Sequence, residues 1–181
     1  MSAADALAGL RAVLTVPIAW AVLADYREIA LVLFVIAALT DAADGYLARR
    51  TLASLVKQGP LPLGRLGPRG DYLDPMADKV LIIGTLLALT IAGTGWPVTV
   101  VTILVALREG LVAILRTRAL ARGVGMPADT IGKAKTAMEM VGVALVIIGG
   151  RPWAVLGAGV VGVAFLVGLV TLPRYFSARV T

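Results

Sequence analysis

Four aspartates have the types and spacing best suited to chemistry: Asp41 and Asp44, then Asp74 and Asp78. Each pair lies at the edge of an apolar run, and a basic loop separates the two pairs. In an α-helix, residues i and i+3 lie about 60° apart and residues i and i+4 about 40° apart, so each pair occupies one helix face. Carboxylates at membrane depth are costly, and four together repel one another without cations. The spacing therefore predicts a site for divalent metal ions.

The chain contains no histidine and no cysteine. Imidazole acid–base chemistry, a thiolate nucleophile and disulfide bonds are therefore excluded. A metal ion bound by side chains must take mainly oxygen ligands, which favours Mg²⁺, Mn²⁺ or Ca²⁺. Pro75 directly after Asp74 also predicts that a helix starts near that point, with Asp74 at or beside its N-cap and Asp78 one turn inside.

The elements that must position these acids are membrane helices. The 181 residues are 59% hydrophobic and only 15% charged, whereas soluble domains are about 45–50% apolar. The apolar runs approach the roughly 20 residues needed to cross a bilayer. We expect one all-α domain over residues 1–181, an integral membrane bundle of six transmembrane helices. The expected spans are 8–24, 29–48, 76–94, 97–119, 134–149 and 153–172.

Short polar or glycine-rich breaks separate three pairs of spans, at 25–28, 93–97 and 149–153. If these three breaks lie on one side of the membrane, only Arg27 and Arg151 of the 17 Lys and Arg residues lie on that side. The positive-inside rule then predicts that both termini are cytoplasmic, in a multi-pass protein of the cell membrane whose aspartates face the cytoplasm. The net charge of +6 reflects this topology, so we expect the lipid bilayer, and no nucleic acid, as a partner.

A sequence pattern surrounds the acids: Asp-x2-Asp-Gly-x2-Ala-Arg, followed by Gly-x3-Asp-x3-Asp. It resembles the signature of the CDP-alcohol phosphotransferase family. The resemblance implies six membrane helices, a cytoplasm-facing site for two Mg²⁺ or Mn²⁺ ions, and a homodimer. One departure is the stretch 50–69 between Arg49 and Gly70, which is longer than is usual in the family and predicts an extended cytoplasmic loop. The matched residues are Asp41, Asp44, Gly45, Ala48, Arg49, Gly70, Asp74 and Asp78.

The resemblance also assigns roles. Asp78 would be both a metal ligand and the general base that accepts a proton from the attacking hydroxyl. The implied metal ligands are Asp41, Asp44, Asp74 and Asp78. The implied contacts to the cytidine nucleotide are Asp41, Asp44, Gly45, Ala48, Arg49, Gly70 and Asp74. Gly45 and Ala48 also fit a small-residue contact between membrane helices.

Further segments resemble the bacterial phosphatidylglycerophosphate synthases of this family: 73–79, Arg108-Glu109, Arg116 and 132–136. That resemblance implies transfer of a phosphatidyl group from CDP-diacylglycerol to glycerol 3-phosphate, with release of CMP. An anionic acceptor needs cationic groups. The candidates for binding its phosphate are Arg108, Arg116, Lys133 and Lys135. Glu139 departs from the synthase pattern, where glutamine is usual, and it adds a negative charge.

Other functions remain open at this point. The same chemistry could serve another acceptor: phosphatidylglycerol, as in a cardiolipin synthase of this type, or a serine or inositol-phosphate head group. A small ion-coupled transporter also places acids in membrane helices. Transporters favour sites at the bilayer midplane and internal repeats, whereas these acids lie at helix ends and no repeat is visible.

Overall fold

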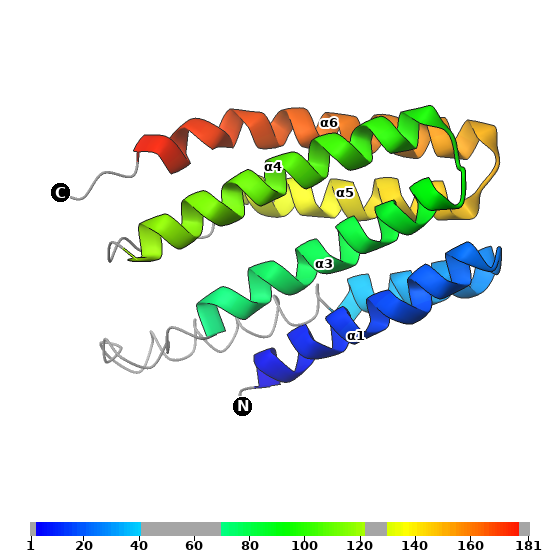
Figure 1. Ribbon diagram of the computed structural model, residues 1–181, viewed down its shortest axis with the longest axis horizontal. Helices are drawn as coiled ribbons and strands as arrows, with labels where there is room; N and C mark the ends of the chain where they lie inside the picture. Colours follow the sequence, from blue (N-terminus) through cyan, green and yellow to red (C-terminus); the bar gives the residue numbers. More distant parts are fainter. Residues whose placement is uncertain (1–2, 41–69, 122–129, 178–181) are drawn as a thin grey trace.

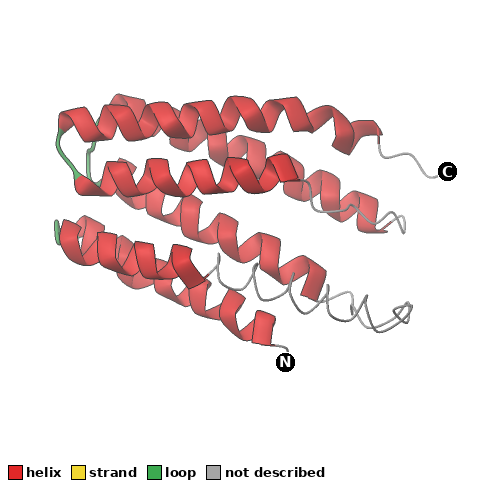
Figure 2. Ribbon diagram, turned by 180° about the vertical axis from the view of Figure 1, so that it is seen from behind, coloured by secondary structure: helices red, strands yellow, loops and turns green. Residues whose placement is uncertain are grey.

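The computed structural model describes residues 3–40, 70–121 and 130–177 (Figure 1). Within these ranges every regular element is a helix, and none is a strand (Figure 2). The all-α prediction is therefore confirmed for this part of the chain. The helices are α1 (Ala3–Leu23), a helix over 27–40, α3 (Gly70–Ile91), α4 (Trp96–Ala121), α5 (Thr130–Ile148) and α6 (Arg151–Ser177).

Helix α3 begins earlier than the sequence predicts. Its first residue is Gly70, so Asp74 and Pro75 lie inside the helix. The prediction that Asp74 caps this helix is therefore wrong. Asp71, beside the new start, favours a helix N-terminus through the helix dipole. Pro75 is the sixth residue of α3 and lies beyond its first turn, so it removes the backbone hydrogen bond that would reach the carbonyl of Asp71.

Three short turns join consecutive helices at one end of the bundle (Figure 1). Each turn contains backbone in the left-handed region: Asp25 with φ 60°, Gly93 with φ 74°, and Gly149 with φ 85°. Asparagine, aspartate and glycine tolerate this conformation best. The start of α1 and the end of α6 both lie at the opposite end, on different sides of the bundle, as the alternating direction of the helices requires (Figure 1).

Among α1, α3, α4, α5 and α6, the pair α5 and α6 packs most extensively, followed by α1 and α3. Glycine allows the first of these contacts. A Cβ atom on Gly157 would lie 2.5 Å from the carbonyl oxygen of Gly142, so the two backbones meet where neither residue has a side chain. Small residues at such contacts are typical of helices that associate in membranes. Large buried side chains such as Phe34, Leu86 and Ile147 fill the space between the helices.

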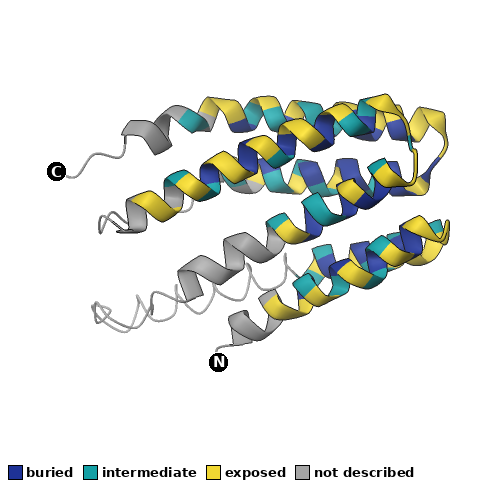
Figure 3. Ribbon diagram, viewed as in Figure 1, coloured by how far each residue is buried: buried dark blue, intermediate teal, exposed yellow. Residues whose placement is uncertain are grey.

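The outward faces of the bundle carry many apolar side chains (Figure 3), among them Val16, Ile103 and Val170, which are 70%, 54% and 73% exposed. Such extensive apolar exposure suits a hydrocarbon environment better than water. Two described segments are long and apolar enough to cross a membrane, Trp96–Leu115 and Arg151–Val170, while Gly9–Leu23 and Lys79–Ile91 are shorter apolar stretches. The composition and these helices indicate a membrane protein.

Candidate active site

Helix α3 carries two of the four predicted metal ligands. Asp74 and Asp78 lie one helical turn apart near its N-terminus, and Gly70 is its first residue. Backbone positions four apart in a helix are neighbours on one face, so the structure agrees with the shared face predicted for this pair. The other predicted members of the site lie outside the described residues; these are Asp41, Asp44, Gly45, Ala48 and Arg49.

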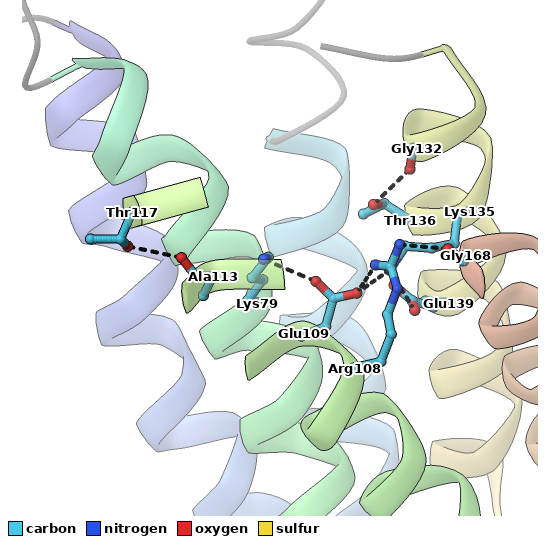
Figure 4. Close-up of polar contacts among 10 residues, drawn as sticks. All are labelled: Lys79, Arg108, Glu109, Ala113, Thr117, Gly132, Lys135, Thr136, Glu139 and Gly168. Carbon is cyan, nitrogen blue, oxygen red and sulfur yellow. Dashed lines mark hydrogen bonds and ion pairs between the residues drawn. The ribbon is translucent and has the colours of Figure 1, made fainter. Parts of the chain in front are cut away.

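Directly after Asp78, Lys79 reaches from α3 into a buried cluster of charges (Figure 4). Its Nζ atom lies 3.0 Å from Oε2 of Glu109 on α4. Glu109 is 5% exposed. The other carboxylate oxygen, Oε1, contacts both the Arg108 guanidinium and the Lys135 Nζ, the latter at 2.5 Å. One carboxylate therefore binds cations from α3, α4 and α5.

Two more groups complete the cluster. Lys135 also donates a hydrogen bond of 2.8 Å to Oε1 of Glu139, one turn further along α5. Arg108 donates a hydrogen bond of 2.9 Å to the backbone carbonyl of Gly168, which brings in α6. We call this set, Lys79, Arg108, Glu109, Lys135, Glu139 and the Gly168 carbonyl, the ionic cluster.

Gly168 fits the ionic cluster because it lacks a side chain. A Cβ atom there would lie 2.9 Å from Cδ of Lys135 and 3.0 Å from Cζ of Arg108. Any larger residue would have to displace one of the two cations. The sequence alone gives no hint of this requirement, because Gly168 lies in a helix with several other glycines.

The ionic cluster holds three cations and two carboxylates, so its formal charge is +1 when all groups are ionised. Isolated charges at such depth are very costly, and pairing with several hydrogen bonds offsets much of that cost. Among the described residues no group of three or more acidic side chains is placed to hold a metal ion. Within that part of the chain, both buried carboxylates of the cluster bind cationic side chains instead.

Two of the residues predicted to bind the acceptor phosphate contact a carboxylate that the sequence analysis did not assign to them. Arg108 and Lys135 are buried, and both contact Glu109. The prediction that they bind the acceptor phosphate stays a prediction. Arg116 lies two turns beyond Arg108 in α4, and Lys133 lies in the first turn of α5. The side chains of Arg116 and Lys133 are outside the described set.

Sequence reasoning missed the role of Glu109 and treated Glu139 only as a departure. One signal was available for each acid. Lys135 and Glu139 have the i, i+4 spacing of a helical ion pair. Glu109 stands in an apolar run, where a carboxylate requires cationic partners. Neither signal identifies Lys79 as a partner, because that contact depends on how α3 and α4 pack.

Comparison with known proteins gives a consistent result. Residues 1–57 and 63–172 match the family model described as CDP-alcohol phosphatidyltransferase. The chain is 31% identical over 165 residues to a protein of Salmonella choleraesuis named CDP-diacylglycerol--glycerol-3-phosphate 3-phosphatidyltransferase. That alignment covers 90% of this chain and 81% of the relative. A Shigella flexneri protein of the same name has the same identity and coverage.

A second group of relatives is mycobacterial. The chain is 35% identical over 124 residues to a protein of Mycobacterium tuberculosis named probable phosphatidylglycerophosphate synthase. The alignment covers 67% of this chain and 51% of the relative, so the chain matches about half the length of that protein.

Proposed function

Because this chain belongs to the CDP-alcohol phosphatidyltransferase family, we propose that it transfers a phosphatidyl group from CDP-diacylglycerol to glycerol 3-phosphate and releases CMP. The observation that carries the proposal is the similarity to the Salmonella enzyme named for that reaction, over 90% of this chain. The position of Asp74 and Asp78 on one face of α3 supports it, since both belong to the motif that resembles the family signature.

The donor set fits a divalent metal ion. Asp74 and Asp78 supply carboxylate oxygens from adjacent turns of α3, and Asp41 and Asp44 of the same motif would complete the set. Oxygen ligands of this kind suit Mg²⁺ or Mn²⁺. Two such ions, when bound, would neutralise the diphosphate and stabilise the negative charge of the departing CMP.

The chain's own residues would then bind and orient the substrates. Gly45, Ala48, Arg49 and Gly70 would hold the cytidine nucleotide together with the aspartates. The acceptor hydroxyl oxygen forms a bond to the lipid-bearing phosphorus, the bond from that phosphorus to the CMP oxygen breaks, and Asp78 accepts the hydroxyl proton. Positioning and charge neutralisation supply most of the rate enhancement in such transfers.

The acceptor phosphate needs cationic groups near α3. The candidates are Arg108, Arg116, Lys133 and Lys135, which belong to α4 and α5. The formal charge of +1 in the ionic cluster leaves an attractive field for an anion beside these helices. Arg116 and Lys133 lie nearer than Arg108 and Lys135 to the helix ends opposite the short turns, where an acceptor dissolved in water would enter.

The proposed setting is the cell membrane. Six transmembrane helices within one domain over 1–181 would cross the bilayer, with both termini, the extended loop 50–69 and the active site on the cytoplasmic side. The clustering of Lys and Arg away from the three short turns supports this orientation. By resemblance to the family, the protein would act as a homodimer.

A cysteine scan tests the orientation, and the absence of natural cysteine makes each introduced thiol unique. Ala92→Cys, at an exposed position in a short turn, should react with a membrane-impermeant maleimide added to intact cells. Ser177→Cys, at the end of α6, should react only after the membrane is opened. The opposite pattern would contradict the proposed topology.

The reaction is tested with purified protein, CDP-diacylglycerol and Mg²⁺ or Mn²⁺, with acceptors offered one at a time. CMP release and the lipid product are measured together. Phosphatidylglycerophosphate should form with glycerol 3-phosphate, and chelation of the metal should stop the reaction. Products from another alcohol alone would contradict the acceptor assignment, and an absence of CMP with every acceptor would contradict the reaction itself.

One observation favours a second candidate, the same transfer to a different acceptor. Lys135 contacts two carboxylates, Glu109 and Glu139, so its charge is largely neutralised before any substrate binds. An acceptor without a free phosphate group, such as serine or phosphatidylglycerol, would need less positive charge at this place. The acceptor series above separates the two candidates.

A further inference from the structure

A cleft of about 220 Å³ lies at the end of the bundle where the three short turns meet (Figure 1). We call it the turn-end cleft. Its lining comes from all three turns or from the helix starts that follow them: Arg27, Thr94, Gly150, Arg151 and Ala154. Pockets that hold a whole small molecule measure roughly 300–1,000 Å³. The turn-end cleft is smaller, so it suits a single chemical group.

Arg27 is held in this cleft from two sides. Its Nε atom donates a hydrogen bond of 2.8 Å to Oδ1 of Asp25. Its guanidinium lies against Gly149, where a Cβ atom would be 2.5 Å from Nη1 and 3.1 Å from Cζ of Arg27. Gly149 also has a φ of 85°, so glycine suits this position by conformation as well as by space. Within the described residues Asp25 uses only the Nε donor, which leaves the donors on Nη1 and Nη2 for a ligand.

Arg151 supplies a second guanidinium to the turn-end cleft. Its side chain is exposed, and no carboxylate in the described part of the chain forms an ion pair with it. The Thr94 hydroxyl donates a hydrogen bond of 2.8 Å to the Leu89 carbonyl, so its proton is already used. The side-chain donors open to a ligand in the cleft therefore come from arginine, which indicates an anion.

The local charge suits an anion with one negative charge. Arg27, Arg151 and the Asp25 carboxylate that pairs with Arg27 sum to a formal charge of +1. Glu28 belongs to the same end of the molecule, but it is exposed and does not line the cleft. A phosphodiester carries a single negative charge, and a guanidinium binds phosphate oxygens through two parallel hydrogen bonds.

The turn-end cleft lies at the level where the chain would enter a bilayer. Two apolar segments long enough to cross a membrane begin beside it, at Trp96 and at Arg151. The chain has three tryptophans, all exposed and all near this end: Trp20 close to the end of α1, Trp96 at the start of α4 and Trp153 in the first turn of α6. Tryptophan is enriched at the membrane–water interface, which is also the level of the lipid head groups.

We propose that the turn-end cleft binds the phosphodiester of a phospholipid head group through Arg27 and Arg151. The start of α6, which forms one wall of the cleft, adds the partial positive charge of a helix N-terminus. Asp74 and Asp78 lie at the opposite end of α3, so this site is separate from the proposed active site. The inference needs a membrane setting and no particular reaction, and it therefore goes beyond the proposed function.

The test uses the tryptophan fluorescence of the purified full-length chain in detergent, because all three tryptophans report on this end. A phosphatidylglycerol with brominated acyl chains is added, and the concentration that gives half of the quenching is measured. Arg151→Gln should raise this concentration about fivefold, as expected for one arginine beside a lipid phosphate. Arg27→Gln should have an effect of the same size. Because Arg27→Gln also removes the contact with Gly149, Arg151→Gln alone decides the test if the Arg27 variant does not fold.

Glu28→Gln is the matched control. It removes one charge from the same end of the molecule at a position outside the cleft, and it should leave the half-quenching concentration within about twofold. An effect of overall charge would instead lower that concentration about as much as Arg151→Gln raises it. A brominated diacylglycerol, which has the same acyl chains and no phosphate, should quench the Arg151→Gln and unsubstituted chains equally.

Three outcomes would overturn the proposal. The first is equal half-quenching concentrations of phosphatidylglycerol for the Arg151→Gln and unsubstituted chains. The second is an equal loss with the brominated diacylglycerol, since no phosphate would then be recognised. The third is reversal of the quenching by inorganic phosphate at the same concentration as the lipid, which would identify free phosphate as the ligand instead of a lipid head group.

Discussion

The contacts between helices differ between the two halves of the bundle, which we call the turn half, next to the three short turns, and the cluster half, which contains the ionic cluster. Near the three short turns, the helices meet through apolar side chains and through glycine, as at Gly142 and Gly157. Near the other end, the same helices meet through the ionic cluster around Glu109. The helices of the turn half meet mainly through close apolar packing, whereas those of the cluster half meet through charged groups of α3, α4 and α5 and a carbonyl of α6.

This difference separates stability from function. Close van der Waals contacts are local and leave no room for added atoms. Substitutions in the turn half should therefore change the stability of the fold and leave the reaction rate unchanged. In the cluster half, removing charged groups from water costs free energy, so buried ion pairs often contribute little net stability. Lys79 of the ionic cluster follows Asp78 directly, so we expect the cluster to serve the proposed active site, and the following changes test the division.

The largest effect is expected from Asp78→Asn. Loss of the proposed general base and metal ligand should lower the rate of CMP release by about 10²-fold to 10⁴-fold, while CDP-diacylglycerol binding persists. Single-turnover CMP release and a lipid-binding assay measure the two quantities. Asp25→Asn makes the same chemical change in a turn, where Asp25 is exposed and asparagine also accepts a positive φ. It should leave the rate unchanged, and a comparable loss in both variants would contradict the assignment.

A moderate effect, on stability alone, is expected from Gly157→Ala. The added Cβ would lie 2.5 Å from the Gly142 carbonyl oxygen, and overpacking of this kind costs about 1–3 kcal/mol. Thermal unfolding in detergent measures the loss, and the activity of the folded fraction should stay unchanged.

Gly159→Ala, two residues along the same helix, is the control. A Cβ there meets nothing within 4 Å, so the change should be neutral or should stabilise the helix by up to about 1 kcal/mol. Equal melting temperatures of the Gly157 and Gly159 variants would show that the close approach of α5 and α6 is absent.

The smallest effect is expected from Thr102→Val. The hydroxyl groups of Thr90 and Thr102 lie 3.1 Å apart and join α3 to α4. Hydrogen bonds between membrane helices contribute about 0.6 kcal/mol on average. The Thr102 hydroxyl also donates a hydrogen bond of 2.7 Å to the Val98 carbonyl of its own helix. Thr85→Val is the control, because the Thr85 hydroxyl donates the same kind of bond, 2.8 Å long, to the Leu81 carbonyl, and no hydrogen bond to another helix among the described residues is lost. The Thr102 variant should lose more stability than the Thr85 variant, and the reverse order would contradict the interhelical role.

The sequence predicts the turn half well for a physical reason. Apolar runs, and breaks that contain Gly93 and Gly149, are local signals, and the helices and positive φ values follow from them. The start of α3 was predicted too late because Pro75 was taken as a boundary. In the structure the helix continues through the proline and begins five residues before it.

The cluster half was predictable only in part. The sequence singled out Arg108 and Lys135 as candidates for binding the acceptor phosphate, and in the structure both contact Glu109. Lys79 and Glu109 are 30 residues apart, and their contact depends on the rotation and depth of two helices. No local pattern encodes those quantities. The roles predicted for Asp74 and Asp78 remain predictions that the experiments above address.

The ionic cluster also dictates an order of events during synthesis. Its groups extend from Lys79 to the carbonyl of Gly168, so it cannot be completed until nearly the whole chain has left the ribosome. The packing of α1 on α3 needs only the first half of the chain and is available much sooner. The packing of α1 on α3 can therefore form before the ionic cluster, and the end of the bundle that carries the cluster is assembled last.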